Sequence, residues 1–267
     1  MRSYLRFVAV GVVYCALAGC DSGSDTGNSS PVSAAQLRDN FSRQLHAGHD
    51  QAALVVAHTL TQRFPRSPEA QAVSAQLPEI EARVASQKAA AAEAATRAAQ
   101  QARIKSVERL KLLLGRMSRE YDSVEHTTFI QPRANSLAAG PKTYVTLYVG
   151  RADSGDTWLR TRLQYGGERW IFFDRIKVNI DGVTLPEEKL GYFRVERDNQ
   201  DGYVWEWADL SVPDAAVPVF EAMAAGKSVV VRFEGKYRKD LVLSSAAKQT
   251  LRDTLEMYSL MKAGFSP

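Results

Sequence analysis

The sequence predicts an α+β protein in which an N-terminal helical hairpin and a long alanine-rich helix precede an antiparallel β-sheet domain with C-terminal helices. From about Pro31 to Val124, apolar residues recur every three or four positions, which indicates amphipathic helices. Beyond Glu125 they alternate with polar residues, as in the strands of a half-buried sheet. Helical spacing returns after Ser244, so helices and sheet occupy separate parts of the chain, which is typical of the α+β class.

Residues 1–19 have the pattern of a secretory signal peptide. Arg2 and Arg6 give a positive start, and the uncharged apolar stretch 7–17 follows. That stretch is too short for a stable membrane span, which takes ~20 apolar residues. We therefore expect residues 1–19 to be removed from the mature protein.

Leu17, Ala18, Gly19 and Cys20 resemble the lipobox of bacterial lipoproteins. The resemblance implies that Cys20 becomes the first mature residue and carries acyl chains that hold it in the lipid bilayer, facing the periplasm. Several chains bind firmly, because each buried methylene contributes ~0.8 kcal/mol. Asp21 resembles an inner-membrane retention signal, but sorting rules differ between bacteria, so the choice between inner and outer membrane stays open. The alternative is an ordinary signal peptide with a chance cysteine.

The remaining composition indicates a globular chain that is held together by its core. Residues 20–30 are small and polar and are predicted to form a lipidated flexible tether. Of the 2 cysteines, Cys15 is lost with the signal and Cys20 carries lipid, so we expect neither a disulfide nor a free thiol. Loss of Arg2 and Arg6 lowers the formal net charge from +4 to +2, which is too small to indicate nucleic-acid binding.

Residues 31–78 are predicted to form a helical hairpin. Ser33 can cap the first helix, Pro65 ends the second, and Pro68 is suited to the first turn of a third. The stretch ALVVAHTLTQRFPRSPEAQAVSAQL resembles a tetratricopeptide-type unit. Only about one and a half repeats are present, whereas an array takes roughly three, so the resemblance implies a hairpin of this style rather than a binding superhelix.

Residues 79–125 are predicted to form one long helix or stalk of ~45 residues and ~67 Å. Alanine dominates its first half, which favours helix but buries little. Its second half carries a heptad-like seam, formed by Val107, Leu110, Leu114, Met117, Tyr121 and Val124. Two interpretations follow: the helix packs on its own C-terminal domain, or Leu110, Leu114 and Met117 pair between chains in a homo-oligomer.

Residues 127–267 are predicted to form the α+β domain, with Asp-Gly and Gly-Gly turn signals between its strands. The expected strands are 144–149, 158–165, 170–180, 192–196, 203–207, 229–233 and 237–243, and the expected helices are 213–225 and one capped by Ser244. The segments LRTRLQYGGERWIFFDRIKVNIDG, ERDNQDGYVWEWADL and VVVRFEGKYRKDLVLSSAAKQTLRDTLEMY resemble a domain of uncharacterised bacterial lipoproteins and prophage-type proteins. The resemblance spans roughly 144–264 and implies a fold unit without a known activity.

The sequence carries no recognisable catalytic, metal or cofactor motif. His46 and His49 are separated by Gly48 and lack a nearby third ligand, so we expect a solvated pair rather than a zinc site. Asp201 and Gly202 fit a hairpin turn better than a calcium loop, because the alternating carboxylates of that loop are missing. A nucleophile elbow, a P-loop and a dinucleotide fingerprint are absent. We therefore expect no enzymatic activity, no metal and no cofactor, although paired carboxylates can still meet in the fold.

Arg160 and Arg162 are candidate partner-binding residues on one predicted strand. Alternation places both on the face opposite Leu159, which we expect to turn toward the C-terminal helices. If acids such as Asp174 or Glu206 answer both arginines, the face is structural. If the arginines are unpaired, the strip is a candidate contact for an anionic group, with which arginine forms bidentate bonds.

Trp205 and Trp207 are the other candidate partner-binding residues, and they share a strand face with Tyr203. Aromatic residues in strands usually build core. An exposed set would instead suit sugars or a protein partner.

These observations favour a membrane-anchored periplasmic lipoprotein without catalysis, which presents a C-terminal binding module on a helical spacer to a protein or envelope component. One alternative is an immunity or inhibitor lipoprotein that neutralises a toxin. The other is an envelope or cell-wall hydrolase, which would need a cleft with convergent carboxylates or a Ser-His pair. The sequence points to no particular partner.

Overall fold

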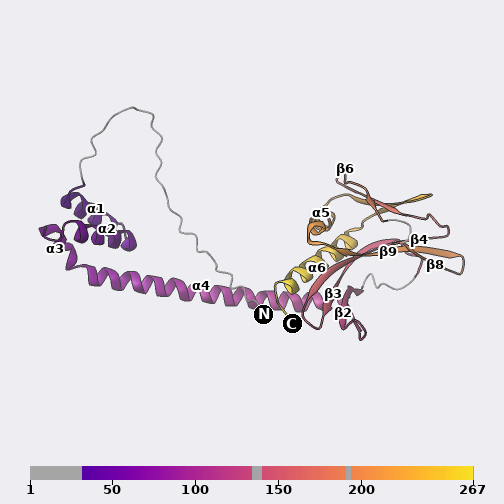
Figure 1. Cartoon of the computed structure of the whole chain (residues 1–267), viewed down its shortest axis with the longest axis horizontal. Helices are drawn as coiled ribbons and strands as arrows, with labels where there is room; N and C mark the ends of the chain where they lie inside the picture. Colours follow the sequence, from indigo (N-terminus) through magenta and orange to yellow (C-terminus); the bar gives the residue numbers. More distant parts are fainter. Residues whose placement is uncertain (1–31, 134–139, 191–193, 267) are drawn as a thin grey trace, which may run out of the picture. The chain divides into compact units, whose positions relative to one another are not determined.

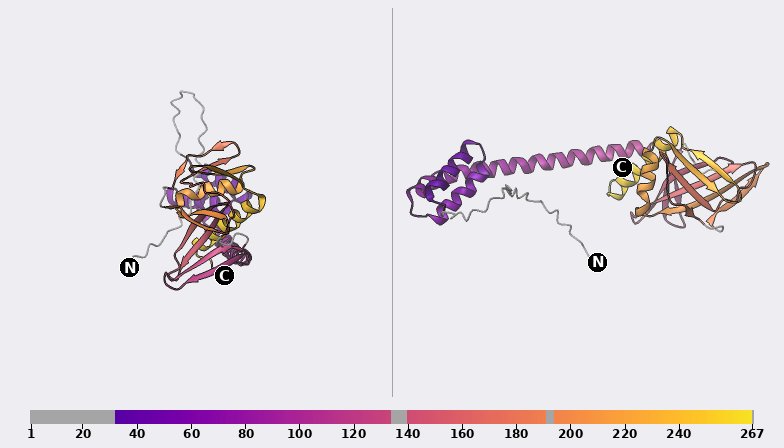
Figure 2. Two further views of the ribbon diagram at one scale, coloured as in Figure 1. Left: turned by 90° about the vertical axis from the view of Figure 1, so that its right-hand side faces the viewer. Right: turned by 90° about the horizontal axis from the view of Figure 1, so that it is seen from above.

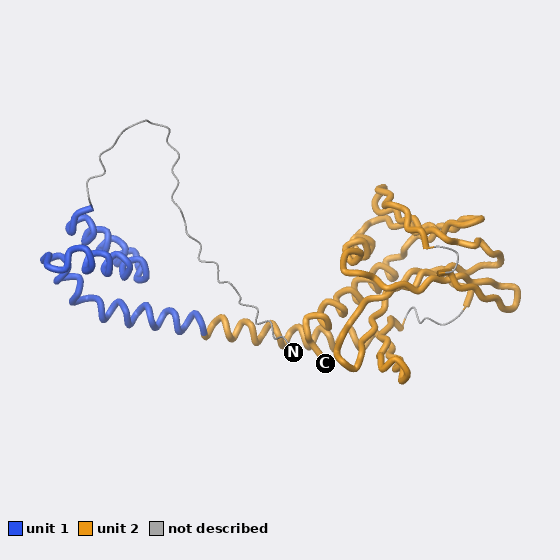
Figure 3. The backbone as a smooth tube through the Cα atoms, in the orientation of Figure 1, with its two compact units in different colours: residues 1–92 blue, residues 93–267 orange. Residues whose placement is uncertain are grey.

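The computed structural model describes residues 32–133, 140–190 and 194–266. They divide into two compact units, residues 1–92 and 93–267 (Figure 3). The predicted α+β class is confirmed, since N-terminal helices precede antiparallel sheets and two C-terminal helices (Figure 1). The predicted signal peptide, the tether with Cys20 and the start of the strand expected at 192–196 lie outside the described residues. Within the described ranges, no helix combines the length and apolar character that a membrane crossing requires.

The N-terminal unit packs short helices around one apolar core. Its helices are α1 (Ala34–His46), α2 (Asp50–Arg63), α3 (Pro68–Ser74) and the first part of α4 (Leu77–Leu114). Ser33 caps α1 as predicted: its side-chain oxygen accepts a hydrogen bond from the backbone N–H of Gln36, and its own backbone N–H donates to Gln36 Oε1. Ser67 caps α3 through one hydrogen bond, which its side-chain oxygen accepts from the backbone N–H of Ala70. Phe41 and Leu60 are buried between the helices.

A buried carboxylate joins α2 to α4 within the N-terminal unit. Asp50 accepts hydrogen bonds from Arg83 at 2.9 and 3.3 Å and from Gln87 at 2.9 Å. The hydrogen bond from Arg83 is the main reason that the pKa of Asp50 lies below its ordinary value. Asp50 therefore holds the two helices together in its charged form.

Helix α4 ends at Leu114, so the prediction of helix to residue 125 is wrong in its last part. Gly115 and Arg116 form a turn, and strand β1 (Met117–Asp122) pairs with strand β2 (Thr127–Pro132). The heptad-like spacing wrongly indicated a helix here, because Met117 and Tyr121 of β1 and Val124 of the following turn are also four and three positions apart.

The predicted seam contributes to the core of the C-terminal unit. Leu110, Leu114 and Met117 are at most 7% exposed and belong to the same cluster as the sheet residues. Tyr121 and Val124, in contrast, are 53% and 86% exposed. These contacts favour packing of the helix on its own domain over pairing between chains, and a homo-oligomer through these residues stays an untested prediction.

The C-terminal unit contains two antiparallel sheets. The larger has the order β1-β2-β3-β4-β9-β8, and the smaller has β11-β10-β5-β6 with β7 also paired to β5. Their other strands are β3 (Tyr144–Ala152), β4 (Thr157–Gly167), β5 (Arg175–Ile180), β6 (Val183–Thr184), β7 (Glu188–Lys189), β8 (Glu196–Gln200), β9 (Tyr203–Val212), β10 (Val229–Glu234) and β11 (Arg238–Val242). The expected strand 170–180 begins only at Arg175, because the preceding residues connect the larger sheet to the smaller one.

That connection is held by a fully buried carboxylate on β9. Glu206 accepts the backbone N–H groups of Ile171, Phe172 and Phe173 at 2.7, 2.8 and 2.9 Å, and Arg197 lies 3.4 Å from its Oε2. Phe172 has φ +55°, a left-handed conformation that brings consecutive N–H groups toward one acceptor. The carboxylate of Glu206 thus accepts the hydrogen bonds of three backbone N–H groups that, in a strand, would be donated to a neighbouring strand.

One C-terminal helix covers part of the inner face of the larger sheet, and a second helix packs against the first. Helix α6 (Ser245–Lys262), capped by Ser244 as predicted, packs against β3 and β4, and α5 (Val217–Ala225) packs against α6 (Figures 1 and 2). Leu159 and Leu163 are buried in the same core as α6 residues, as the alternation along β4 predicts. The opposite side of the sheet, called the outer face below, carries the alternate residues of β4.

Candidate functional site

The outer face brings the two candidate arginines together with aromatic side chains from neighbouring strands. Strand β4 lies between β3 and β9, so its alternate residues meet partners from both. In register order, Arg160, Arg162 and Gln164 stand between Tyr148, Thr146 and Tyr144 of β3 and Ser211, Asp209 and Trp207 of β9. The face is therefore polar and aromatic, whereas the inner face is apolar.

Arg160 has hydrogen-bond and ion-pair partners within the chain. Its Nε and one terminal nitrogen donate to Asp209 Oδ1 at 2.9 and 2.7 Å, and its Nε also donates to Tyr148 Oη at 2.7 Å. Burial and, after it, the hydrogen bond to Asp209 raise the pKa of Tyr148 far above its ordinary value. The phenol therefore stays protonated and donates a hydrogen bond of 2.6 Å to Asp209 Oδ1. The acid that pairs with Arg160 is neither Asp174 nor Glu206 but Asp209, which reaches Arg160 diagonally from the position on β9 that lies opposite Arg162.

Arg162 differs from Arg160 in having no carboxylate partner among the described residues. Asp209 is its register neighbour on β9, but that carboxylate turns to Arg160 instead. The guanidinium of Arg162 stacks on Trp207, with Cζ 5.0 Å from the ring centroid, and its Nε is buried without a hydrogen-bond partner in the described structure. This half-buried cation is the feature of the outer face that internal contacts leave unsatisfied.

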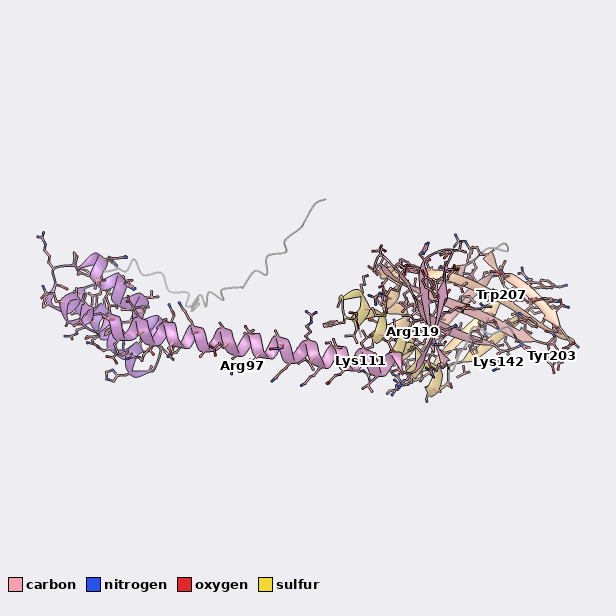
Figure 4. The ribbon with its side chains drawn as sticks, turned by 90° about the horizontal axis from the view of Figure 1, so that it is seen from below. Arg97, Lys111, Arg119, Lys142, Tyr203 and Trp207 are labelled. Atoms are coloured by element: carbon pink, nitrogen blue, oxygen red, sulfur yellow. The ribbon has the colours of Figure 1, made fainter. Side chains whose placement is uncertain are left out.

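The tryptophans of β9 also differ from each other. Trp205 is only 4% exposed, so it is a packing residue that offers little surface to a partner. Trp207 is half-buried beneath Arg162, and Tyr203 is 47% exposed. Figure 4 shows Tyr203, Trp207 and Lys142 at the end of the C-terminal unit that lies away from Lys111 of α4. The accessible aromatic and basic groups are therefore Trp207, Tyr203, Lys142 and Arg162.

Two glycines shape this face by leaving room for other groups. Gly150 on β3 is opposite Trp158 on β4, and a methyl group at Gly150 would overlap the indole ring. A methyl group at Gly166 would overlap the backbone of Pro141. The chain before β3 thus runs closely over the end of β4, where Gln164 donates to the carbonyl oxygen of Gly140 at 2.8 Å.

The structure also contains an apolar cavity of about 450 Å³ that sequence reasoning missed. It lies between the inner face of the larger sheet, the smaller sheet and α5, and it opens beside the segment before β7. Val145, Leu163, Val178, Leu210, Phe220 and Met223 are among its lining residues. No local motif could have revealed it, because these residues come from five elements that are far apart in the sequence.

The candidate metal residues do not converge. His46 Nδ1 forms a hydrogen bond with the Ser42 carbonyl oxygen at 2.6 Å, and His49 Nδ1 one with Gln44 Oε1 at 3.1 Å. Across the described ranges, no group of three or more histidine, cysteine, aspartate or glutamate side chains is arranged to hold a metal ion. The absence of a metal and of a cofactor in the working protein stays a prediction.

No protein-family model, curated protein or solved structure matches this chain. The outer face offers an unsatisfied guanidinium beside exposed aromatic rings. The interior of the same unit offers an apolar cavity.

Proposed function

We propose that this chain is a lipid-anchored protein of the bacterial cell envelope, and that its C-terminal unit binds an anionic group of a protein or envelope component without catalysis. The lipobox-like residues from Leu17 to Cys20 support the anchor. The observation that carries the binding role is Arg162, a half-buried guanidinium that stacks on Trp207 and has no carboxylate partner in the described structure.

An anion is the ligand class that this arrangement favours. A guanidinium has five N–H donors, and stacking on an indole engages the flat face of the group rather than these donors. A carboxylate or phosphate can accept two of them at once in a bidentate pair. The neighbouring Arg160 is paired with Asp209, so Arg162 is the one of these two arginines that has no carboxylate partner among the described residues.

The rest of the proposed site supplies contact area. Tyr203 and Trp207 present amphipathic rings on the same strand face, and such rings are frequent in binding surfaces. Lys142 is exposed on the segment that runs over β4 and adds a second positive charge. Because the strands are held by ladders on both sides, the face is a rigid platform rather than a mobile loop.

The test is site-specific photocrosslinking in intact cells with p-benzoylphenylalanine in place of Tyr203. We expect a crosslinked product in the wild-type background that falls about tenfold or more with Arg162→Ala, because a charged hydrogen bond contributes roughly 1.5–3 kcal/mol. Arg162→Lys should restore only part of the signal, because lysine keeps the charge but lacks the planar fork.

The matched control is Arg119→Ala, which removes an exposed arginine from β1 without touching the outer-face cluster. It should leave the crosslink unchanged. The melting temperatures of all variants are measured in parallel. An unchanged crosslink in a normally folded Arg162→Ala protein would remove Arg162 from the site and overturn the proposal.

A further inference from the structure

The C-terminal unit also contains the apolar cavity between its two sheets. Its inner part is lined by core residues such as Val145, Met223 and Val231, which are at most 2% exposed. Toward solvent the lining changes to Val219, which is 36% exposed, and to Pro186. The cavity is thus a surface cleft whose floor is formed by residues of the core.

Water is a poor occupant of this cleft. The cavity has the volume of about fifteen water molecules, and each ordered water needs two to four polar partners. Thr161 is the one hydroxyl on the deeply buried part of the lining, and it already donates to the Thr146 carbonyl oxygen at 3.1 Å. The inner lining therefore offers almost no bonds to water, and an apolar guest is favoured instead.

The volume of the cleft limits the shape of the ligand that it can bind. A single turn of an α-helix with its side chains, ~10 Å wide and 5.4 Å high, fills about 420 Å³. The cavity of about 450 Å³ would therefore accept barely one turn of a partner helix, which is too little for an amphipathic-helix partner. An unbranched acyl chain is narrower than a helix and can lie along the apolar floor of the cleft.

We propose that this cleft binds the acyl chain of a lipid whose headgroup carries no negative charge. Glu188 on β7 is the one charged residue of the described lining, and it is exposed at the mouth. A carboxylate at that position repels an anionic headgroup and leaves an uncharged one unaffected. The proposal uses the inner face of the sheet and is independent of the anion site around Arg162.

The experiment uses the full-length chain with Cys20→Ser, so that the acyl chains of the protein itself do not compete. Binding is measured by the fluorescence of the neutral probe N-phenyl-1-naphthylamine and by its displacement. We expect saturable binding and displacement by monomyristoylglycerol below its aggregation concentration. Myristate should displace the probe about fivefold less well at pH 8, because of charge repulsion near the surface, and Glu188→Gln should remove this difference.

Variants of the lining locate the bound probe. Val219→Glu places a charge at the mouth and should weaken probe binding by tenfold or more, whereas Val242→Glu, a matched change at an exposed valine of β11, should not. Ala216→Trp narrows the cleft without adding charge, and it replaces Val219→Glu if that variant fails to fold. Arg162→Ala should bind the probe normally, which separates this proposal from the outer-face site.

Two results would overturn the proposal. One is the absence of saturable probe binding to the folded protein. The other is binding that the folded lining variants leave unchanged, or that Val242→Glu weakens equally, because the probe would then lie elsewhere. Equal displacement by myristate and monomyristoylglycerol would overturn the headgroup assignment.

Discussion

Replacing Glu206 by glutamine tests whether one buried carboxylate holds the two sheets of the C-terminal unit in place. The side chain is fully buried on β9 and accepts the N–H groups of three consecutive residues, Ile171 to Phe173. These residues link β4 of the larger sheet to β5 of the smaller one. Glutamine has nearly the same shape, so the substitution changes charge and hydrogen bonding while leaving the volume almost constant.

The expected loss follows from the number of donors. Ile171 and Phe172 donate to one carboxylate oxygen and Phe173 to the other, so an amide nitrogen at either position faces at least one N–H group without an acceptor. A buried donor without a partner costs about 1–3 kcal/mol, and the remaining bonds lose their charge assistance. Arg197 also loses its anionic neighbour. Together these effects should lower the free energy of unfolding by about 3–5 kcal/mol.

Tryptophan fluorescence is a selective assay for this change, because Trp158, Trp170, Trp205 and Trp207 are the 4 tryptophans of the chain and all lie in the C-terminal unit. Urea denaturation should show a lower midpoint for Glu206→Gln, and the melting temperature should fall by about 10 °C. Glu196→Gln, at an exposed acid on β8, is the control and should melt like the wild type. A loss below about 1 kcal/mol for Glu206→Gln would refute the three-donor argument.

Two further predictions concern the rest of the chain. Cys20→Ser should release the protein from membranes, and a variant that still sediments with membranes after a carbonate wash would show that something other than an acylated Cys20 holds it. Asp50 has a lowered pKa in the folded state because of Arg83, so its contribution to stability is present above the unfolded value near 3.8 and is lost as the pH falls through the lowered folded value. The helical signal of the wild type should therefore fall more steeply than that of Asp50→Asn on acidification below about pH 4, as followed by far-UV circular dichroism, and parallel curves for the two proteins would contradict this role of Asp50.

Local patterns in the sequence predicted most of the elements, but they failed where partners distant in the sequence decide the structure. Caps such as Ser33 and Ser244 were recognised because a cap depends on residues within one helical turn. Strand β1 was missed because its apolar residues continue the spacing of the preceding helix. Residues 117–122 are a strand because they pair with β2, and the spacing of their own apolar residues gives no sign of that pairing.

The candidate site was predicted only in part, because its side-chain pairs also depend on residues that are distant in the sequence. Alternation along β4 correctly placed Arg160 and Arg162 on one face, opposite the core. It could not predict that Asp209 pairs with Arg160 rather than with Arg162, because Asp209 is the register neighbour of Arg162 and its carboxylate turns diagonally to Arg160. The apolar cleft was beyond prediction for a stronger reason, since it is a space between two sheets whose relative position no local pattern specifies.

The two glycines of the outer face have different consequences for how the sequence can change in evolution. Gly150 is restricted by the side chain of Trp158, so a smaller residue at 158 would free position 150 to accept a side chain. Gly166 is restricted by the backbone of Pro141, which no single side-chain replacement can remove. Among divergent descendants of this chain, positions 150 and 158 should therefore vary together, whereas position 166 should remain glycine for as long as the segment before β3 follows its present course.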